Sequence, residues 1–145
     1  MSSIPTPVRE FLTTGPLAHV ITLNTDGTPH VSLAWAGVDG DEVVFATFNP
    51  DQHKIRNLRR DPRVTLSFQA KEHTGPTLHP YLVVRGRVSV AEGGALPLMD
   101  HLSQWYIGPG QQFPMRNVPE GAVMHVTVEK VYGVGPWKDA PQTSE

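Results

Sequence analysis

The chain has 145 residues, enough for one domain with a sizeable hydrophobic core. It contains no cysteine, which excludes a disulfide framework, a cysteine-ligated zinc site and thiol chemistry, and fits a reducing cytoplasm. The formal net charge of −2 argues against a general nucleic-acid-binding protein, and no apolar run reaches the ~20 residues that a membrane-spanning helix needs. We therefore expect a single cytoplasmic domain over residues 1–145, with neither nucleic acid nor membrane as a partner.

The first half of the chain predicts a short helix followed by three strands. The helix opens at Thr6-Pro7, because proline suits the first helical position, and it ends at Gly15-Pro16. Two glycine turns, at Asp26-Gly27 and Asp39-Gly40, then separate three β-rich runs into two hairpins. The strands that follow from these turns span residues 18–24, 29–38 and 42–48.

The second of these strands has two unlike faces. Val31, Leu33 and Trp35 are large and apolar, and we expect them to face the core. The alternate side chains are small or polar, and they leave a shallow shelf on which a flat ring can lie against strand backbone. The alternative is an ordinary solvated sheet face, which is the commoner arrangement for one strand alone. The shelf residues are His30, Ser32, Ala34 and Ala36.

The segment 49–63 carries the densest chemistry. Asn49 is a good helix N-cap, Pro50 a good first helical residue, and Gln52 can close a capping box. Pro62 disfavours helical geometry at Asp61, so the predicted helix has about 10 residues. A helix start can hold phosphate through its unpaired N–H groups and its positive dipole end. The segment therefore predicts an anion-binding helix that follows directly from a strand.

The cations of this helix support two interpretations. Lys54 adds a mobile positive charge one turn after the start, on the same face as Asn57, and we expect it to be exposed. Arginines late in a helix complement its negative end and stay solvated, which is the simpler explanation of the remaining cations. Alternatively, they extend the positive potential around a bound anion. These residues are Arg56, Arg59, Arg60 and Arg63.

The second half predicts three more strands and one helix. The strands span residues 63–69, 81–91 and 123–134, and apolar residues at helical spacing begin at Ala95 and stop before Gly108. Gly86 marks a bulge or a close approach of another backbone. The ordered core is expected to cover about 6–137, with the tail 138–145 frayed. Six strands joined by tight turns predict a mainly β protein with short helices, arranged as an antiparallel closed or nearly closed barrel.

Several kinds of site are not supported by the sequence. Seven histidines show no metal-ligand spacing, so no metal site is expected. No G-x-S-x-G, Walker A or GxGxxG motif occurs, which removes support for a serine hydrolase, a P-loop or a Rossmann domain. No acid–base pair can be argued either. We therefore predict no catalytic side chains.

Four stretches, residues 23–32, 54–64, 84–88 and 131–137, together resemble a known family. The chain is similar to the split β-barrel flavin and deazaflavin proteins related to pyridoxamine 5′-phosphate oxidase, and most of all to actinobacterial F420-dependent oxidoreductases of the FDOR-B group. The resemblance covers roughly residues 6–137. It implies a six-stranded antiparallel split β-barrel with the PNPOx-like FMN-binding fold, and a homodimer with cofactor sites at the subunit interface.

The resemblance also implies cofactor contacts at named positions. Lys54 and Asn57 would contact the phosphate or tail, and Thr47 and Phe48 would line the approach to the phosphate. His53 precedes the lysine, where many relatives carry another basic residue, and histidine is cationic only at mildly acid pH. The residues that would flank the ring, largely through backbone, are Ser32, Leu33 and Ala34. Those that would come from the second subunit are Tyr81 and Trp137.

The function implied by the resemblance is hydride transfer from reduced coenzyme F420 to a small conjugated organic acceptor. Because such a cofactor carries the hard chemistry, the lack of a catalytic constellation does not argue against an enzyme. Two alternatives stay open. FMN also has a flat ring and one phosphate, so the chain could be an FMN-dependent oxidoreductase, or it could be a non-catalytic carrier of F420 or flavin. Loops 70–80 and 108–121 are expected to shape the acceptor pocket.

Overall fold

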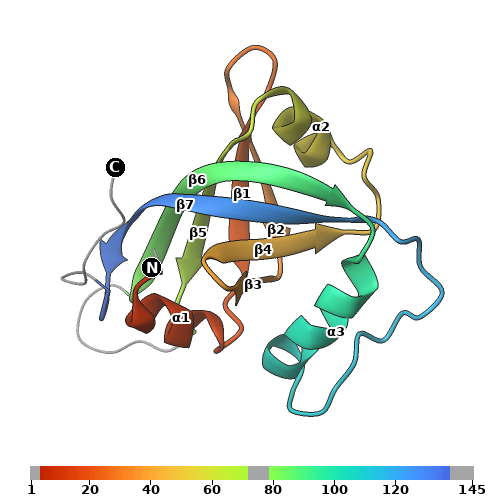
Figure 1. The fold of residues 1–145 in the computed structure, drawn as a ribbon. Helices are drawn as coiled ribbons and strands as arrows, with labels where there is room; N and C mark the ends of the chain where they lie inside the picture. Colours follow the sequence, from red (N-terminus) through yellow and green to blue (C-terminus); the bar gives the residue numbers. More distant parts are fainter. Residues whose placement is uncertain (1–3, 72–78, 138–145) are drawn as a thin grey trace.

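The structure, a computed structural model, describes residues 4–71 and 79–137, so the expectation for the tail 138–145 and most of that for loop 70–80 fall outside it. One antiparallel sheet, with three helices packed around it, makes up the described chain (Figure 1). The elements are α1 (Thr6–Leu12), β1 (Ala18–Leu23), β2 (Pro29–Ala34), β3 (Ala36–Asp39), β4 (Glu42–Thr47), α2 (His53–Arg60), β5 (Arg63–Gln69), β6 (Tyr81–Glu92), α3 (Ala95–Tyr106) and β7 (Ala122–Val134).

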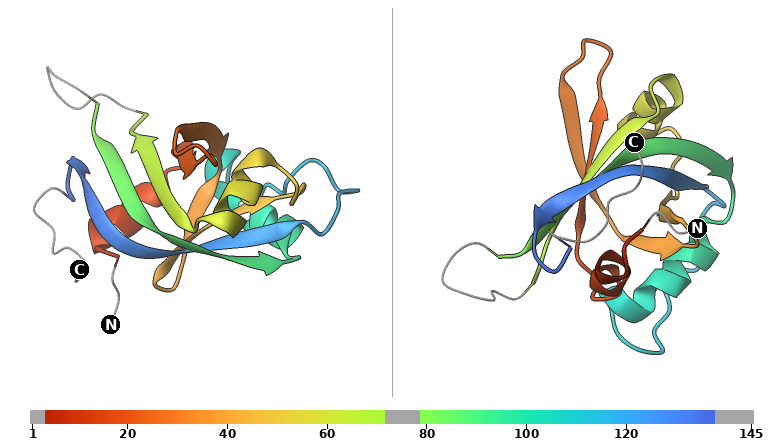
Figure 2. Two further views of the ribbon diagram at one scale, coloured as in Figure 1. Left: turned by 90° about the horizontal axis from the view of Figure 1, so that it is seen from above. Right: turned by 60° about the vertical axis from the view of Figure 1, so that its left-hand side comes forward.

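The sheet curls into a barrel whose two ends are consecutive in the chain. Its strand order is β2-β1-β5-β6-β7-β4-β3, so the end strands β2 and β3 are separated only by Trp35. The β1–β2 hairpin extends beyond the rest of the barrel, beside α2 (Figure 2). The predicted mainly β antiparallel fold is confirmed. The sheet has seven strands where six were expected, because Trp35 interrupts the predicted strand over 29–38.

A continuous apolar core fills the barrel. Helix α1 covers one end with Val8 and Leu12, and α2 contributes Ile55 and Leu58, all of them buried. The largest fully buried strand residues come from five strands, which shows that the barrel interior is the core of the domain. They are Val20, Val43, Phe45, Leu66, Phe68, Leu82 and Met124.

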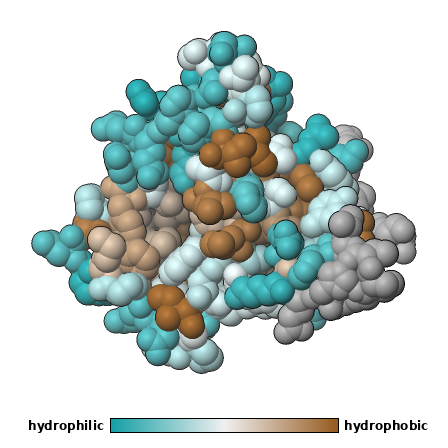
Figure 3. Space-filling view, turned by 180° about the vertical axis from the view of Figure 1, so that it is seen from behind, coloured by the Kyte–Doolittle hydropathy of each residue, from teal (hydrophilic) through white to brown (hydrophobic). Residues whose placement is uncertain are grey.

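The prediction for the faces of residues 29–35 is wrong. Val31 and Leu33 are 57% and 55% exposed, whereas His30, Ser32 and Ala34 are half-buried. The reason is that β2 lies at the end of the sheet, where its inner face meets α2 as well as the core: the ring of His30 stacks on His53 of that helix. The large apolar side chains therefore point outward. In the view from behind, apolar atoms gather in the middle of the molecule (Figure 3).

The expectation for Gly86 is correct in both of its parts. The register between β6 and β7 shifts between Arg85 and Gly86, and a Cβ at residue 86 would lie 2.1 Å from the carbonyl oxygen of Thr127. The two long strands can approach this closely only because residue 86 has no side chain.

Gly86→Ala should destabilise the fold by about 1–3 kcal/mol, because the added methyl group meets backbone that cannot move aside without breaking the ladder. Urea unfolding measures the change. Ser89→Ala is the matched control, since Ser89 is exposed on the same strand. A variant as stable as the wild type would show that the close approach is not maintained in solution.

Candidate functional site

A groove of about 450 Å³ lies between the β2–β3 junction, the end of β4, the start of α2, and α3 with the loop that follows it. One side of its lining is polar and comes from the β4–α2 connection. The other side is apolar and aromatic. The lining residues are Leu33, Ala34, Trp35, Ala46, Thr47, Phe48, Asn49, Gln52, Lys54, Met99 and Phe113. Five of the expected cofactor-binding residues are therefore together in one groove: Leu33, Ala34, Thr47, Phe48 and Lys54.

Local hydrogen bonds shape the β4–α2 connection and correct the predicted start of the helix. The Thr47 hydroxyl accepts a hydrogen bond from the N–H of Asn49 (3.0 Å) and lies 2.7 Å from the side-chain oxygen of Gln52, to which it can donate. The Asn49 side chain accepts from the N–H of Asp51 (3.0 Å). These turns use up the groups expected to cap the helix. Helix α2 therefore begins at His53, with Gln52 at the N-cap and no side-chain cap.

Lys54 is buried, contrary to the expectation that it would be exposed. Only 7% of it is accessible, and its ammonium group donates one long hydrogen bond, 3.4 Å, to the carbonyl oxygen of Leu33. Burial lowers the pKa of Lys54. No carboxylate pairs with it anywhere in the described ranges. A buried cation without a counter-charge costs free energy, and an anion in the groove would offset that cost.

Side chains of α2 next to Lys54 tie the helix to the β1–β2 hairpin. The Asn57 amide donates to the hydroxyl of Thr22 and to the side-chain oxygen of Asn24, both at 3.1 Å, and the His53 ring lies 2.7 Å from that same oxygen. Asn57 is buried by these contacts and does not line the groove. The hairpin therefore fixes the helix in place.

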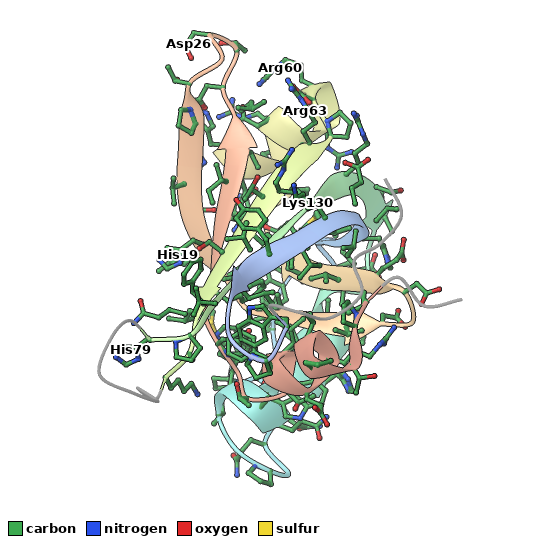
Figure 4. All side chains as sticks on the ribbon, turned by 90° about the vertical axis from the view of Figure 1, so that its left-hand side faces the viewer. His19, Asp26, Arg60, Arg63, His79 and Lys130 are labelled. Atoms are coloured by element: carbon green, nitrogen blue, oxygen red, sulfur yellow. The ribbon has the colours of Figure 1, made fainter. Side chains whose placement is uncertain are left out.

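A second hollow, of about 270 Å³, lies between this helix and the hairpin; we call it the hairpin hollow. It is lined by Asn24, Thr25, His53, Arg56, Asn57 and Arg60. Its lining contains two arginines and no carboxylate. Arg60 donates to the carbonyl oxygen of Leu23, and it lies beside the hairpin whose tip carries Asp26 (Figure 4). Two positively charged cavities thus flank the first turns of α2.

Two polar atoms of β2 are buried without a partner. They are Nδ1 of His30 and Oγ of Ser32, on the face of the strand opposite Val31 and Leu33. The His30 ring stacks on that of His53, with ring centres 4.4 Å apart and planes 8° from parallel. The pKa of His30 is lowered by burial and, to a lesser degree, by repulsion from His53 and Lys54. His30 therefore takes up a proton less readily than an ordinary histidine does.

The aromatic side of the groove is built around Trp35. Its ring stacks on Tyr106 with centres 4.9 Å apart and meets the ring of Phe113 edge-on at 5.7 Å; Phe113 also contacts Phe48 at 5.3 Å. The Tyr106 hydroxyl accepts from the N–H of Ala36 (3.0 Å), which joins α3 to β3. Burial raises the pKa of Tyr106 to about 12. Met99 was not predicted, since helical spacing indicates only a packed face. The loop 108–121 was expected to shape a pocket and does supply Phe113, although its sequence did not single out that residue.

Tyr81 and Trp137 lie apart from the groove within the subunit. Trp137 is buried against Phe11, with ring centres 4.7 Å apart, and its indole N–H donates to the carbonyl oxygen of Tyr81 at 2.9 Å. Their contribution to a partner's site stays a prediction. Among the residues that the structure describes, no three His, Asp or Glu side chains gather as metal ligands, and no helix has the length and apolar character needed to cross a membrane.

The chain matches the sequence model of one protein family and shares its fold with several solved structures. The sequence model of the family described as pyridoxamine 5′-phosphate oxidase matches residues 4–135. No curated protein sequence matches the chain significantly. Among solved structures, one named F420 reductase has a TM-score of 0.72 at 24% identity, over 89% of this chain and 98% of that one.

Two further structures share the fold at lower identity. A conserved hypothetical protein from Mycobacterium tuberculosis has a TM-score of 0.69 at 20% identity, over 92% of this chain and 84% of its own. HupZ from Group A Streptococcus has a TM-score of 0.65 at 17% identity, over 97% and 99%. At these identities the likeness shows the fold alone.

His30 should make stability depend on pH. Its folded-state pKa lies below the ordinary 6.5, so the unfolded chain binds the proton more readily, and the free energy of unfolding should fall as pH drops below about 6.5. Urea unfolding between pH 7.5 and 5 should show a shallower decline for His30→Asn. His19→Asn, on the exposed face of β1, should keep the wild-type decline. Identical slopes for wild type and His30→Asn would contradict the assignment.

Proposed function

The chain belongs to the pyridoxamine 5′-phosphate oxidase family, and from this premise we propose that it is an oxidoreductase that transfers a hydride from reduced coenzyme F420 to a small conjugated organic acceptor. The observation that carries the proposal is the buried ammonium group of Lys54, which faces the groove without a carboxylate partner in the described chain. The bound deazaflavin supplies the hydride. The residues of the chain bind it, orient it and exclude water.

The polar side of the groove fits a phosphate group. Lysine is a common phosphate ligand as a point charge, and the Thr47 hydroxyl and the Gln52 amide add neutral polar groups beside it. An anion bound here would offset the cost of burying Lys54.

The aromatic side fits a planar ring. Leu33, Ala34 and Trp35 present backbone and apolar side chains, and Met99 and Phe113 add apolar surface from α3 and the loop that follows it. A volume of about 450 Å³ lies within the range of small-molecule and cofactor sites. The arrangement suits a ligand that joins a flat ring to an anionic group, which describes both F420 and FMN.

The hairpin hollow favours F420 over FMN. F420 carries carboxylates beyond its phosphate, whereas FMN has a single phosphate. Arg56, which makes no ion pair within the described residues, lines this hollow together with His53 and Arg60, and no carboxylate is among the lining residues. The hairpin hollow therefore offers a binding site for a second anionic group besides the phosphate in the groove. FMN is the second candidate because the family is named for a flavin oxidase.

The proposed assembly is a homodimer with cofactor sites at the interface. Large apolar side chains are exposed on both β2 and β7: Val31 and Leu33 on the first strand, Tyr132 and Val134 on the second. Exposed apolar groups of this kind mark interaction surfaces. Because Leu33 also lines the groove, a second subunit on this face would lie next to the bound cofactor.

Lys54→Met should weaken binding of oxidised F420, or of FMN, by about 1–3 kcal/mol, the value of a charge-assisted hydrogen bond. The free protein should be as stable as the wild type or more so, since an unpaired buried charge is replaced by an apolar chain of similar length. Fluorescence titration gives the Kd and urea unfolding the stability. Arg59→Met is the control, because Arg59 lies on the same helix but is exposed and paired with Glu92. Unchanged affinity would remove Lys54 from the site.

Arg56→Ala should weaken F420 binding several-fold and leave FMN binding unchanged, since only F420 reaches a second anionic site. The ratio of the two Kd values, measured at one salt concentration, is the quantity to compare. Equal losses for both cofactors, or none, would show that the hairpin hollow does not take the F420 tail.

A further inference from the structure

Phe113 is held in place by a closed set of three hydrogen bonds. Its N–H donates to Oδ1 of Asp100 (2.9 Å), and its carbonyl oxygen accepts from Nη1 of Arg116 (3.2 Å). The same nitrogen of Arg116 donates to Oδ1 of Asp100 at 2.6 Å. Phe113 lies in the connection 107–121, which has neither helix nor strand, so these bonds fix one residue of an otherwise irregular segment.

The fixed residue is the one that reaches the groove. The Phe113 ring meets Trp35 and Phe48 and forms part of the lining, and Met99, the neighbour of Asp100 on α3, lines the groove as well. Neither Asp100 nor Arg116 is a lining residue. Arg116 is exposed, and exposed ion pairs add little to the stability of a fold. The main effect of the three hydrogen bonds is to hold the Phe113 backbone, and with it the Phe113 ring, in one position.

We propose that Asp100 is a positioning residue, which together with Arg116 holds Phe113 as a wall against which the planar ring of the bound cofactor packs. The inference rests on the proposed function and deepens it, because it divides ligand recognition between two parts of the chain. Lys54 acts on the anionic group, and Asp100 acts on the ring alone, through Phe113.

The test compares each cofactor with its phosphate-free form: F420 with its deazaflavin riboside, and FMN with riboflavin, all oxidised. In whichever of these two pairs binds, Asp100→Ala should raise the Kd of the cofactor and of its phosphate-free form by the same factor, about three- to tenfold. Phe113→Ala should do the same, and the double variant should be no weaker than Phe113→Ala, because Asp100 acts only through Phe113. In the free protein, Asp100→Ala should speed amide exchange at Phe113.

Two further variants separate positioning from a general effect on folding. Asp100→Asn keeps an oxygen that accepts from the Phe113 N–H, so it should lose less affinity than Asp100→Ala. Asp41→Asn removes a comparable exposed pair, with Arg9, outside the groove lining, and should leave every Kd unchanged. Urea unfolding of each variant checks that it is folded.

The possible results distinguish the two proposals. If the wild type binds no deazaflavin or flavin, the proposed function fails and this inference fails with it. If the wild type binds but Asp100→Ala leaves both Kd values unchanged, only this inference is overturned. The inference would also be overturned if Asp100→Ala weakened binding of only the phosphate-bearing form. It would equally be overturned if the effects of Asp100→Ala and Phe113→Ala on Kd were fully additive in the double variant.

Discussion

The burial of the Lys54 ammonium group between α2 and β2 is the constraint on which the site depends. One long hydrogen bond to Leu33 does not offset the cost of removing a cation from water. The rest of the fold must therefore hold the side chain in place, and the groove beside it becomes selective for anions. The unfavourable free energy of burying the unpaired Lys54 ammonium group is the physical source of the expected affinity for an anionic cofactor.

The β1–β2 hairpin supplies that support. Asn24 on the hairpin lies within hydrogen-bonding distance of both His53 and Asn57, and the stack of His30 on His53 adds a contact from the returning strand. None of these residues is part of the groove lining. They keep the helix close to β2, and this packing buries the Lys54 side chain beside Leu33.

Local sequence predicted the turns and one close approach of two strands, although it placed the start of α2 too early. Glycine turns separated the strands, and the missing side chain of Gly86 indicated the close approach to Thr127. The outward direction of Val31 and the burial of Lys54 could not be predicted, because each depends on which element packs against β2. Periodicity identifies two faces of a strand but not the one that meets the core, and β2, at the end of the sheet, is paired on one side only.

The same distinction divides the two sides of the groove. Its polar side comes from the continuous segment Thr47 to Lys54, where strand end, turn and helix start follow one another, and sequence pattern indicated that side. Its aromatic side joins Trp35 to Phe113, which are distant in sequence and brought together by α3. One continuous segment of the chain can therefore form an anion-binding site, whereas a surface for a planar ring needs residues from several segments. The small side chains of residues 30–36 and the family resemblance both predicted a planar ring at β2, but neither identified the side chains that face it from α3 and the following loop.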